Sequence, residues 1–344
     1  MAKRKKFTVV DVAARAGVSP ATVSRAFNRP KLLSPETLDG VMRAAKDLNF
    51  IPNALARSLL SGKSGFAALV VPDISDPFFA RLAYSLDQAL RSEGMVLIVC
   101  HTSEQRIEEE YIMRLLEERR IDGLVWVSEA PADGSPSPFE VSSIPRVMIE
   151  RLPDTEPADA ILLDKSGVSK VVEYLVDLGH RRIAMVTGHQ QTYGGRELYR
   201  AFEQAMSEKG LEVPDQYVVS GDFKYEGGRN AVARLMAAIP PPTAVFVGSD
   251  RMSHGFMTGV TENGLRVPDD LSVVAFSTSL IDNLVHPPLT SCQSSYEEIG
   301  REAARLLIDR MRDPDSPSRQ VVIPTEFLIR RSCRGVTELE RDAV

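Results

Sequence analysis

Two short helices joined by a tight turn are the feature that most restricts how the start of this chain folds. Residues 8–11 (Thr-Val-Val-Asp) have the form of a capping box, which predicts a helix from there to about Gly17, a natural C-terminal residue. Ser19 is a second N-cap and Pro20 occupies the favoured first helical position, so a second helix is expected over 20–28. Only three residues separate the two helices, and this spacing predicts a helix-turn-helix.

The second helix has two distinct faces. Val23, Ala26 and Phe27 form its apolar face, and the opposite face carries Ala21, Ser24, Arg25 and Asn28. Ser34-Pro35 opens a third helix, whose expected core stripe is Leu38, Val41, Met42, Ala45 and Leu48. In such a three-helix arrangement the N-terminal end of the second helix enters the major groove of DNA.

The distribution of charge supports a polyanion as the partner of this segment. Residues 1–63 carry twelve basic and four acidic side chains, a net charge of +8. The rest of the chain carries 29 basic and 43 acidic side chains, a net charge of −14. A compact basic head on an acidic body is typical of a nucleic-acid-binding protein. The alternative, a solvated basic tail, does not account for the helix caps and the periodicity.

Length and composition limit the remaining classes. A chain of 344 residues predicts two or three domains. No run of about 18 apolar residues is present, so no transmembrane helix is expected. No apolar stretch follows the basic N-terminus, so we expect a cytoplasmic protein without a secretory signal. Cys100, Cys292 and Cys333 are too far apart to predict a disulfide framework or a zinc site, and we expect no metal and no cofactor.

A short helix is predicted between head and body. Pro52 ends any preceding helix and Asn53 can cap a new one. That helix has only about seven residues, too few to be stable alone in water. It runs into the linker Ser61-Gly62-Lys63-Ser64-Gly65. A marginal helix in this place is where a switch between head and body could lie.

These motifs together resemble the lac repressor family of bacterial regulators. The resemblance is carried by Asp11-Val12-Ala13, by residues 17–25 (Gly-Val-Ser-Pro-Ala-Thr-Val-Ser-Arg) and by a hinge-helix-like segment at 51–59, and it continues to about Ser332. It implies a DNA-binding regulator, a repressor, that binds a palindromic operator. The residues that the motifs and the resemblance place on DNA are Thr8, Ser19, Pro20, Ala21, Thr22, Ser24, Arg25, Asn28, Asn53, Ala56, Arg57 and Leu59. Leu59 matches the wedge that this family inserts at the centre of its operator.

The body reads as two α/β halves. Buried parallel strands are expected at 67–71, 96–100, 124–127 and 147–149, then again from Ile161 and at 183–186, 217–219, 244–247 and 273–276, with helices between them. This alternation predicts two doubly wound parallel sheets with a ligand between them. The resemblance implies a body like a periplasmic sugar-binding protein. In such a body the chain crosses between the halves, and the helix at 296–312 returns to the first half.

These observations give the expected domain boundaries. The helix-turn-helix domain covers 1–52, the hinge and linker 53–65, the effector-binding and dimerisation domain 66–333, and a short tail 334–344. Within the body, the first half comprises about 66–163 and 295–322, and the second half about 164–294 and 323–333.

No catalytic constellation is present in the sequence. There is no nucleophile elbow, no phosphate-binding loop of the Walker type, no zinc-protease motif and no dinucleotide fingerprint. His180 belongs to a Leu-Gly-His-Arg-Arg turn that resembles a structural feature of the family. The acidic run Glu108-Glu109-Glu110 reads as a solvated helix face. We therefore expect no enzyme.

The candidate pocket residues follow strand ends. Phe78 and Phe79 follow the first strand of the body and either reach the effector or form the core at a helix start. Phe223 matches a family position where a ring stacks on the effector. Glu150 and Asp250 match acidic positions at strand ends. Effector contacts are thus expected from these five residues.

Three departures from the family pattern weaken a simple sugar effector. Ser249 stands where the family has an asparagine, Ser277 where it has an acid that grips hydroxyls, and Leu198 where it has an arginine. Arg196, two residues away, is the candidate substitute for that arginine, and Ser277 stays a candidate contact. A sugar or sugar derivative remains the leading effector class, and a less hydroxylated effector or none at all stays open.

Two other functions compete with the regulator. A solute-binding protein of the periplasmic sugar-binding type conflicts with the missing signal and the complete capped head. An enzyme on an α/β sheet lacks a nucleophile or cofactor motif. The two-fold symmetry of an operator predicts a homodimer. The tail has a single leucine, Leu339, and is too short for a coiled coil that would form a tetramer.

Overall fold

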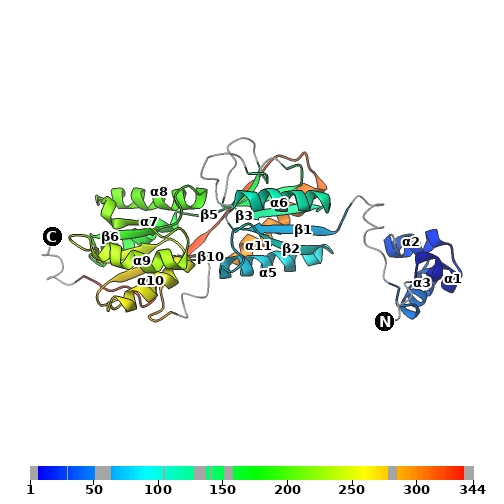
Figure 1. Cartoon of the computed structure of the whole chain (residues 1–344), viewed down its shortest axis with the longest axis horizontal. Coiled ribbons are helices and arrows are strands. Elements are labelled where there is room, and N and C mark those ends of the chain that lie inside the picture. Colours follow the sequence, from blue (N-terminus) through cyan, green and yellow to red (C-terminus); the bar gives the residue numbers. More distant parts are fainter. Residues whose placement is uncertain are drawn as a thin grey trace. The chain divides into compact units, whose positions relative to one another are not determined.

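The computed structural model describes residues 7–28, 30–50, 63–103, 105–127, 137–139, 142–150, 158–277 and 285–336. The chain divides into two compact units, 1–65 and 66–344 (Figure 1). No helix among these residues has both the length and the apolar content needed to cross a bilayer.

The first unit is a small helical domain with the predicted caps. It comprises α1 (Val9–Ala16), α2 (Pro20–Asn28), the 3-10 turn η1 (Pro30–Leu32) and α3 (Pro35–Asp47). Thr8 and Asp11 form the reciprocal capping box of α1, and Gly17 ends that helix at a φ of 66° in the left-handed region. The Ser34 side chain caps α3. The caps define where each helix begins, so the turn between α1 and α2 is fixed by sequence.

A small apolar core joins the three helices. Its buried members are Val12, Ala13, Val23, Ala26, Val41, Ala44 and Ala45. Phe27 packs against Phe50, with ring centroids 5.9 Å apart. The predicted stripe of α3 was wrong at Met42, which is 47% exposed. Ala44 takes that place because the buried face of α3 turns toward both α1 and α2.

The second unit contains two six-stranded sheets in its described part. The first sheet has the order β11-β5-β4-β3-β1-β2, and all its pairs are parallel. Its strands are β1 (Phe66–Val71), β2 (Val96–His101), β3 (Gly123–Val127), β4 (Arg146–Ile149), β5 (Asp159–Leu163) and β11 (Gln320–Ile323). The helices that pack on it are α5 (Pro77–Ser92), α6 (Arg106–Glu118) and α11 (Tyr296–Arg312). The return of the late helix to this half is confirmed, since α11 packs with α5 in one core.

The second sheet has the order β12-β10-β9-β8-β6-β7. Its strands are β6 (Ile183–Thr187), β7 (Val218–Ser220), β8 (Ala244–Val247), β9 (Ser272–Ser277), β10 (Thr290–Ser294) and β12 (Thr325–Leu328). Its helices are α7 (Gly167–Asp177), α8 (Tyr193–Glu208), η2 (Asp215–Tyr217), α9 (Tyr225–Met236) and α10 (Asp250–Glu262). The predicted fold class is confirmed. One detail differs, because β12 runs antiparallel to β10 after the chain returns from the first sheet.

The chain passes between the two sheets three times. The passages follow β5, β10 and β11, each of which ends where the next element belongs to the other sheet. Near them, a Cβ placed on Gly167 would lie 2.4 Å from Sγ of Cys292 and 2.6 Å from Oγ1 of Thr325. Gly167 is therefore required by the close approach of α7, β10 and β12 just beyond the crossings.

Each sheet is covered on both faces by helices, as parallel sheets require (Figure 1). Successive side chains of a strand point to opposite faces of the sheet. Val125 and Val127 join the core under α5 and α11, whereas Trp126 joins the core under α6 and packs against Phe139 with ring centroids 5.2 Å apart. Trp126 is 1% exposed as a result.

Two predicted polar residues have structural roles. His180 is 3% exposed, and its ring nitrogens lie 2.9 Å from Oγ1 of Thr243 and 3.0 Å from the carbonyl of Arg334. The acidic run on α6 is not wholly solvated, because Glu109 is buried and accepts a hydrogen bond from the Ser137 hydroxyl at 2.8 Å.

Asp159 provides a test of what holds the first half together. It is fully buried, accepts a 2.9 Å bond from Arg310 on α11 and a 2.8 Å bond from the backbone N–H of Arg319. Asp159→Asn leaves the Arg310 charge without its counterion, and breaking a buried pair costs about 3–5 kcal/mol. We expect a lower midpoint of urea unfolding. Glu226→Gln is the control, since its partner Arg229 is exposed and such pairs are worth about 0–1 kcal/mol. Equal effects of the two changes would contradict this role for Asp159.

Candidate functional site

The first candidate surface is the exposed side of α2. Ser19, Pro20, Ala21 and Arg25 are exposed, and Thr22 and Ser24 are half-buried. The Ser19 hydroxyl accepts the backbone N–H of Thr22 at 3.1 Å and lies 2.9 Å from the Thr22 hydroxyl. This contact caps the helix and places small polar groups around its N-terminus, where N–H groups and the positive end of the helix dipole favour an anion.

The exposed side of α2 carries little charge. Arg25 is the only charged residue in the sequence of α2. Arg15 on α1 lies 3.4 Å from Asp47 of α3, and both side chains are exposed. Thr8 is exposed at the start of α1. The predicted contacts Thr8, Ser19, Pro20, Ala21 and Arg25 are thus all accessible.

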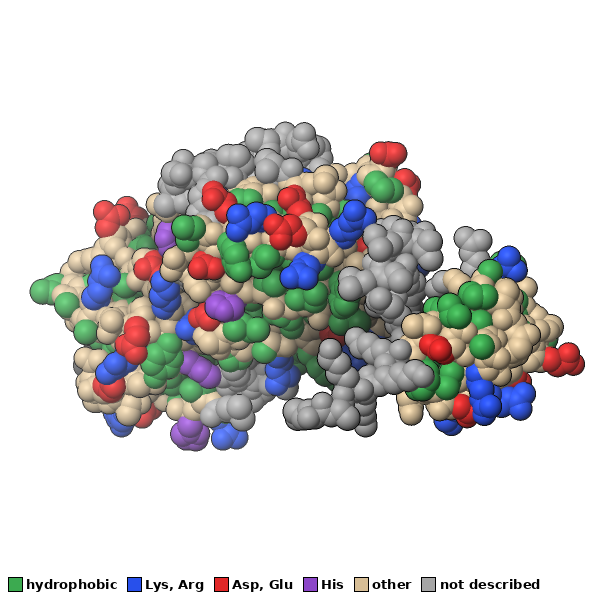
Figure 2. Space-filling model, turned by 45° about the vertical axis from the view of Figure 1, so that its right-hand side comes forward, with side chains coloured by type: hydrophobic (Ala, Val, Ile, Leu, Met, Phe, Trp, Pro, Cys, Tyr) green, Lys and Arg blue, Asp and Glu red, His purple; other side chains and the backbone are tan. Residues whose placement is uncertain are grey.

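Part of the predicted DNA surface falls outside the described residues. This holds for Asn53, Ala56, Arg57 and Leu59 of the hinge segment and for the side chain of Asn28. The sequence places much of the positive charge of the head there too, at Lys3, Arg4, Lys5, Lys6, Arg29 and Arg57. Figure 2 shows acidic and basic side chains interspersed on one face of the body.

The second candidate site is a cavity of about 190 Å³ in the second unit, between its two sheets. Loops and helix starts that follow strands of both sheets line it, as expected for doubly wound sheets. Phe78, Phe79, Glu150, Phe223, Asp250 and Ser277, all predicted from sequence, line this pocket. Ser249 and Leu198, two of the departures from the family pattern, line it as well.

Arg196 does not line the pocket. It is exposed on α8 and donates to the carbonyl of Gln191 at 2.9 Å. Two positions along an α-helix turn by about 200°, so a side chain at 196 cannot point where Leu198 points. Leu198 is 2% exposed and faces the cavity itself. The substitution of Arg196 for the missing arginine was therefore wrong.

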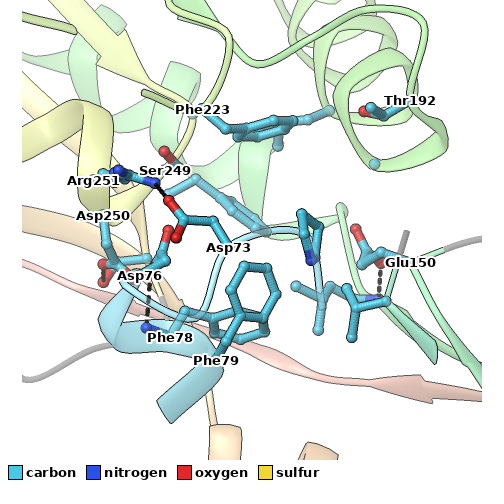
Figure 3. A pocket seen from close by; sticks show the side chains of 18 of the residues that line it. Asp73, Asp76, Phe78, Phe79, Glu150, Thr192, Phe223, Ser249, Asp250 and Arg251 are labelled. Atoms are coloured by element: carbon cyan, nitrogen blue, oxygen red, sulfur yellow. Dashed lines mark hydrogen bonds and ion pairs between the residues drawn. The ribbon is translucent and has the colours of Figure 1, made fainter. Parts of the chain in front are cut away.

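A different arginine reaches the cavity. Arg251, on α10 of the second half, donates to Oδ2 of Asp73 in the first half at 2.8 Å, and the pair crosses the cleft (Figure 3). Hydrogen bonds from Ser75, followed by Arg251, lower the pKa of Asp73 to about 2. Asp73 is consequently ionised at neutral pH. Sequence gave no signal for this pair, because its members are far apart in the chain.

Glu150 forms a second polar contact zone. Its carboxylate accepts hydrogen bonds from Nζ of Lys165 and from the backbone N–H of Leu163, each 2.6 Å long. A Cβ placed on Gly194 would lie 2.8 Å from Oε2 of Glu150. Gly194 belongs to the first turn of α8, so the carboxylate approaches a helix N-terminus from the other half. The backbone of Glu150 itself has a φ of 53°.

Aromatic rings form the apolar walls. Phe78 and Phe79 start α5 and pack edge to face, with centroids 5.1 Å apart, while Asp76 caps this helix by accepting the N–H of Phe78 at 2.9 Å. Phe78 and Phe79 both pack against the first core and also line the pocket, so the core alternative is confirmed and the effector contact stays a prediction. Phe223 lies opposite Phe79 across the cavity (Figure 3).

The Ser277 side chain is hydrogen-bonded within the pocket wall. It is 2% exposed and its hydroxyl donates to the Asp250 carboxylate. The Ser249 side chain caps α10 by accepting the N–H of Met252 at 3.3 Å. Both serine side chains thus make local hydrogen bonds in the pocket wall. They stand at the two positions where the family pattern has an acid and an amide.

The comparisons with known proteins agree with this architecture. Residues 8–53 match the family described as bacterial regulatory proteins, lacI family, and residues 172–333 match the periplasmic binding protein-like domain. Catabolite control protein A of Priestia megaterium is 31% identical over 329 residues, covering 95% of this chain and 99% of that protein. This chain belongs to the lacI family of bacterial regulatory proteins.

Other members of the lacI family are equally similar. The HTH-type transcriptional repressor CytR of Escherichia coli (strain K12) is 31% identical over 336 residues, which is 96% of this chain and 97% of that repressor. The transcriptional regulator CelR–cellobiose complex superposes with a TM-score of 0.72 at 31% identity, over 95% of this chain and 100% of that one.

The lac repressor dimer bound to operator and the anti-inducer ONPF shows the same fold, with a TM-score of 0.85 at 23% identity over 96% of this chain and 100% of that one. As a lacI-family member, this chain is a DNA-binding transcriptional regulator. The relatives named here are regulators rather than enzymes.

Gly188 provides a test of the pocket wall. A Cβ placed on it would lie 1.9 Å from Cζ of Phe223. In Gly188→Ala the ring must therefore leave its position, and overpacking of this kind costs about 1–3 kcal/mol. A crystal structure of the variant is expected to show Phe223 displaced, with a lower unfolding midpoint. Gly40→Ala is the control because nothing lies within 4 Å of its added Cβ. A Phe223 ring that stays in place would contradict the packing described here.

Proposed function

We propose that this regulator binds a palindromic operator as a homodimer and represses transcription under the control of a small-molecule effector. The observation that supports it best is that one chain has both a capped helix-turn-helix and a body cleft crossed by the ion pair between Arg251 and Asp73. The proposal includes a cytoplasmic location and no enzymatic activity. A sugar-like effector is the starting class.

The domain organisation is part of this proposal. Residues 1–52 bind the major groove, 53–65 form the hinge and linker, 66–333 bind the effector and dimerise, and 334–344 are a short tail. The halves of the body comprise about 66–163 with 295–322, and about 164–294 with 323–333. Phe78, Phe79, Glu150, Phe223, Asp250 and Ser277 are the proposed effector contacts; Arg196 is left out.

Control acts through the relation between the two halves of the body. A ligand that prefers one closure angle shifts the equilibrium only by its differential affinity for the two states. Arg251–Asp73 crosses the cleft, so its geometry depends on that angle. Operator affinity follows by reciprocal linkage.

The experiment that tests the regulator is operator selection from random DNA with the full chain. Selection of a palindrome whose half-sites are related by two-fold symmetry, bound by two copies, is the expected result. Affinity should fall steeply with salt, because basic side chains release counterions from the phosphates. Recovery of no sequence preference would contradict the proposal and favour a solute-binding function instead.

Arg25 is the proposed base reader. A guanidinium can bridge a guanine edge, and loss of such a contact costs about 1–3 kcal/mol. Arg25→Ala should weaken operator binding by that amount in a fluorescence anisotropy titration and relax the preference at one base position. Arg43→Ala on the exposed surface of α3 is the matched control and should weaken binding evenly across sequences. Unchanged affinity and preference in Arg25→Ala would remove this role.

Leu59 is the proposed wedge at the operator centre. An apolar wedge unstacks a base step and kinks the duplex, and this distortion is offset by added contact. Leu59→Ala should reduce specific binding much more than non-specific binding, whereas Leu60→Ala, about 100° around a helix, should have the smaller effect. A helix of about seven residues should form only on the operator. Slow amide exchange at 54–60 without DNA would contradict that part.

A further inference from the structure

The two halves of the body approach each other on both sides of the cavity. On one side Arg251 of the second half contacts Asp73 of the first half. On the opposite side Glu150 of the first half lies near Thr192, the N-cap of α8 in the second half (Figure 3). The proposed effector would lie between these two places, so both bear on how far the halves can close.

The approach on the Glu150 side leaves no room for a side chain on α8. A Cβ placed on Gly194, in the first turn of this helix, would lie 2.8 Å from Oε2 of Glu150, and the three heavy atoms nearest to it all belong to Glu150. Burial, followed by the charges of Glu197 and Glu150, raises the pKa of the neighbouring Tyr193 phenol. Only a residue without a side chain allows the carboxylate to come this close.

The Glu150 carboxylate is fixed to its own surroundings. It accepts hydrogen bonds from Nζ of Lys165 and from the backbone N–H of Leu163, each 2.6 Å long. Its own backbone N–H donates to the carbonyl of Ile161 at 2.8 Å. A carboxylate that turned aside would leave the Lys165 ammonium, whose side chain is only 13% exposed, without its counterion. The side chain of Glu150 therefore resists a change of position.

The start of α8 is fixed to the second half in the same way. The Thr192 hydroxyl accepts the N–H of Gly195 at 3.1 Å and donates to the carbonyl of His189 at 2.7 Å. A Cβ placed on Gly195 would lie 2.2 Å from that same carbonyl oxygen, so the helix start is packed tightly against its own half. With both partners held, a side chain at position 194 is accommodated by moving the halves apart.

We propose that Gly194 is the positioning residue that sets how far the body closes, because its missing side chain lets the Glu150 carboxylate of one half reach the first turn of α8 in the other. This inference rests on the proposed control through the angle between the halves and names a residue that determines that angle. A change on this side of the cavity then biases the same equilibrium as a change at Arg251 or Asp73.

Crystal structures of the full chain with Gly194→Ala and Gly194→Leu test the effect on closure. Alanine is a better helix former than glycine, so α8 itself is not weakened. The backbones of residues 150 and 194 should lie farther apart in Gly194→Ala and farther still in Gly194→Leu, with the bonds from Lys165 and Leu163 to Glu150 kept. Gly335→Ala is the control, since the nearest atom to its added Cβ is at an ordinary 3.6 Å. Halves that keep their separation while the Glu150 side chain turns aside would overturn the inference.

Operator affinity provides the functional readout and is measured by fluorescence anisotropy without any added ligand. Gly194→Ala should change it about fivefold or more, in the same direction as Asp73→Ala, because both changes favour the open body. An opposite direction in the two variants would overturn the inference.

A double variant shows whether the effect passes through Glu150. Glu150→Ala removes the carboxylate and leaves only the Cβ of residue 150, at 3.7 Å from the added methyl group. Gly194→Ala should therefore change operator affinity less than about twofold in the Glu150→Ala chain, as expected for residues in direct contact. Effects of the two changes that add in full would contradict the proposed contact.

These results separate the role of Gly194 from the proposed function. Unchanged separation of the halves, with normal operator binding by the unmodified chain, rejects only the role of Gly194. A widened separation with unchanged operator affinity supports that role and rejects control through the angle between the halves. Failure of the unmodified chain to bind any palindromic operator rejects the proposed function, whatever the crystal structures show.

Discussion

The ion pair between Arg251 and Asp73 connects the two halves of the body across the cavity. It joins α10 of one half to the loop after β1 of the other at 2.8 Å. Both side chains are about one-third exposed, at 29% and 34%, so solvent screens the pair less than it screens a surface pair. The three chain crossings connect the two halves covalently, and this ion pair connects them across the cavity.

The pocket is built around that contact. Asp73 lies at the end of β1, Glu150 at the end of β4, and Ser249 and Asp250 at the end of β8, so parallel strands place polar groups at the mouth of both sheets. Aromatic side chains from α5 and from the loop before α9 provide the walls. A ligand bound here contacts both halves at once, and this is the condition for coupling binding to the angle between them.

Much of the fold was predictable because its signals are local. The capping box at Thr8 and the caps at Ser19 and Ser34 act within one helical turn, so sequence alone located the starts of the first three helices. The parallel strands were evident as short apolar runs. The antiparallel β12 was not, because its direction follows from where the chain re-enters the second sheet.

The site was predictable only in part. Glu150, Phe223 and Asp250 stand at strand ends or match family positions, and the structure brings them to one cavity. Arg251 and Lys165 were missed, since their importance comes from residues that are distant in sequence. Arg196 points away from the cavity although it is only two positions from Leu198, because two positions along an α-helix turn a side chain by about 200°.

Whether the cleft controls the head can be measured without knowing the effector. Operator affinity of Arg251→Ala, Asp73→Ala and the double variant is compared with that of the unmodified chain by fluorescence anisotropy, with Arg266→Ala, a 70% exposed residue, as control. We expect a change of about fivefold or more in each single variant, with no further change in the double variant, because coupling between sites is typically about 1–3 kcal/mol. Operator affinity that is the same in all four variants and the unmodified chain would contradict it.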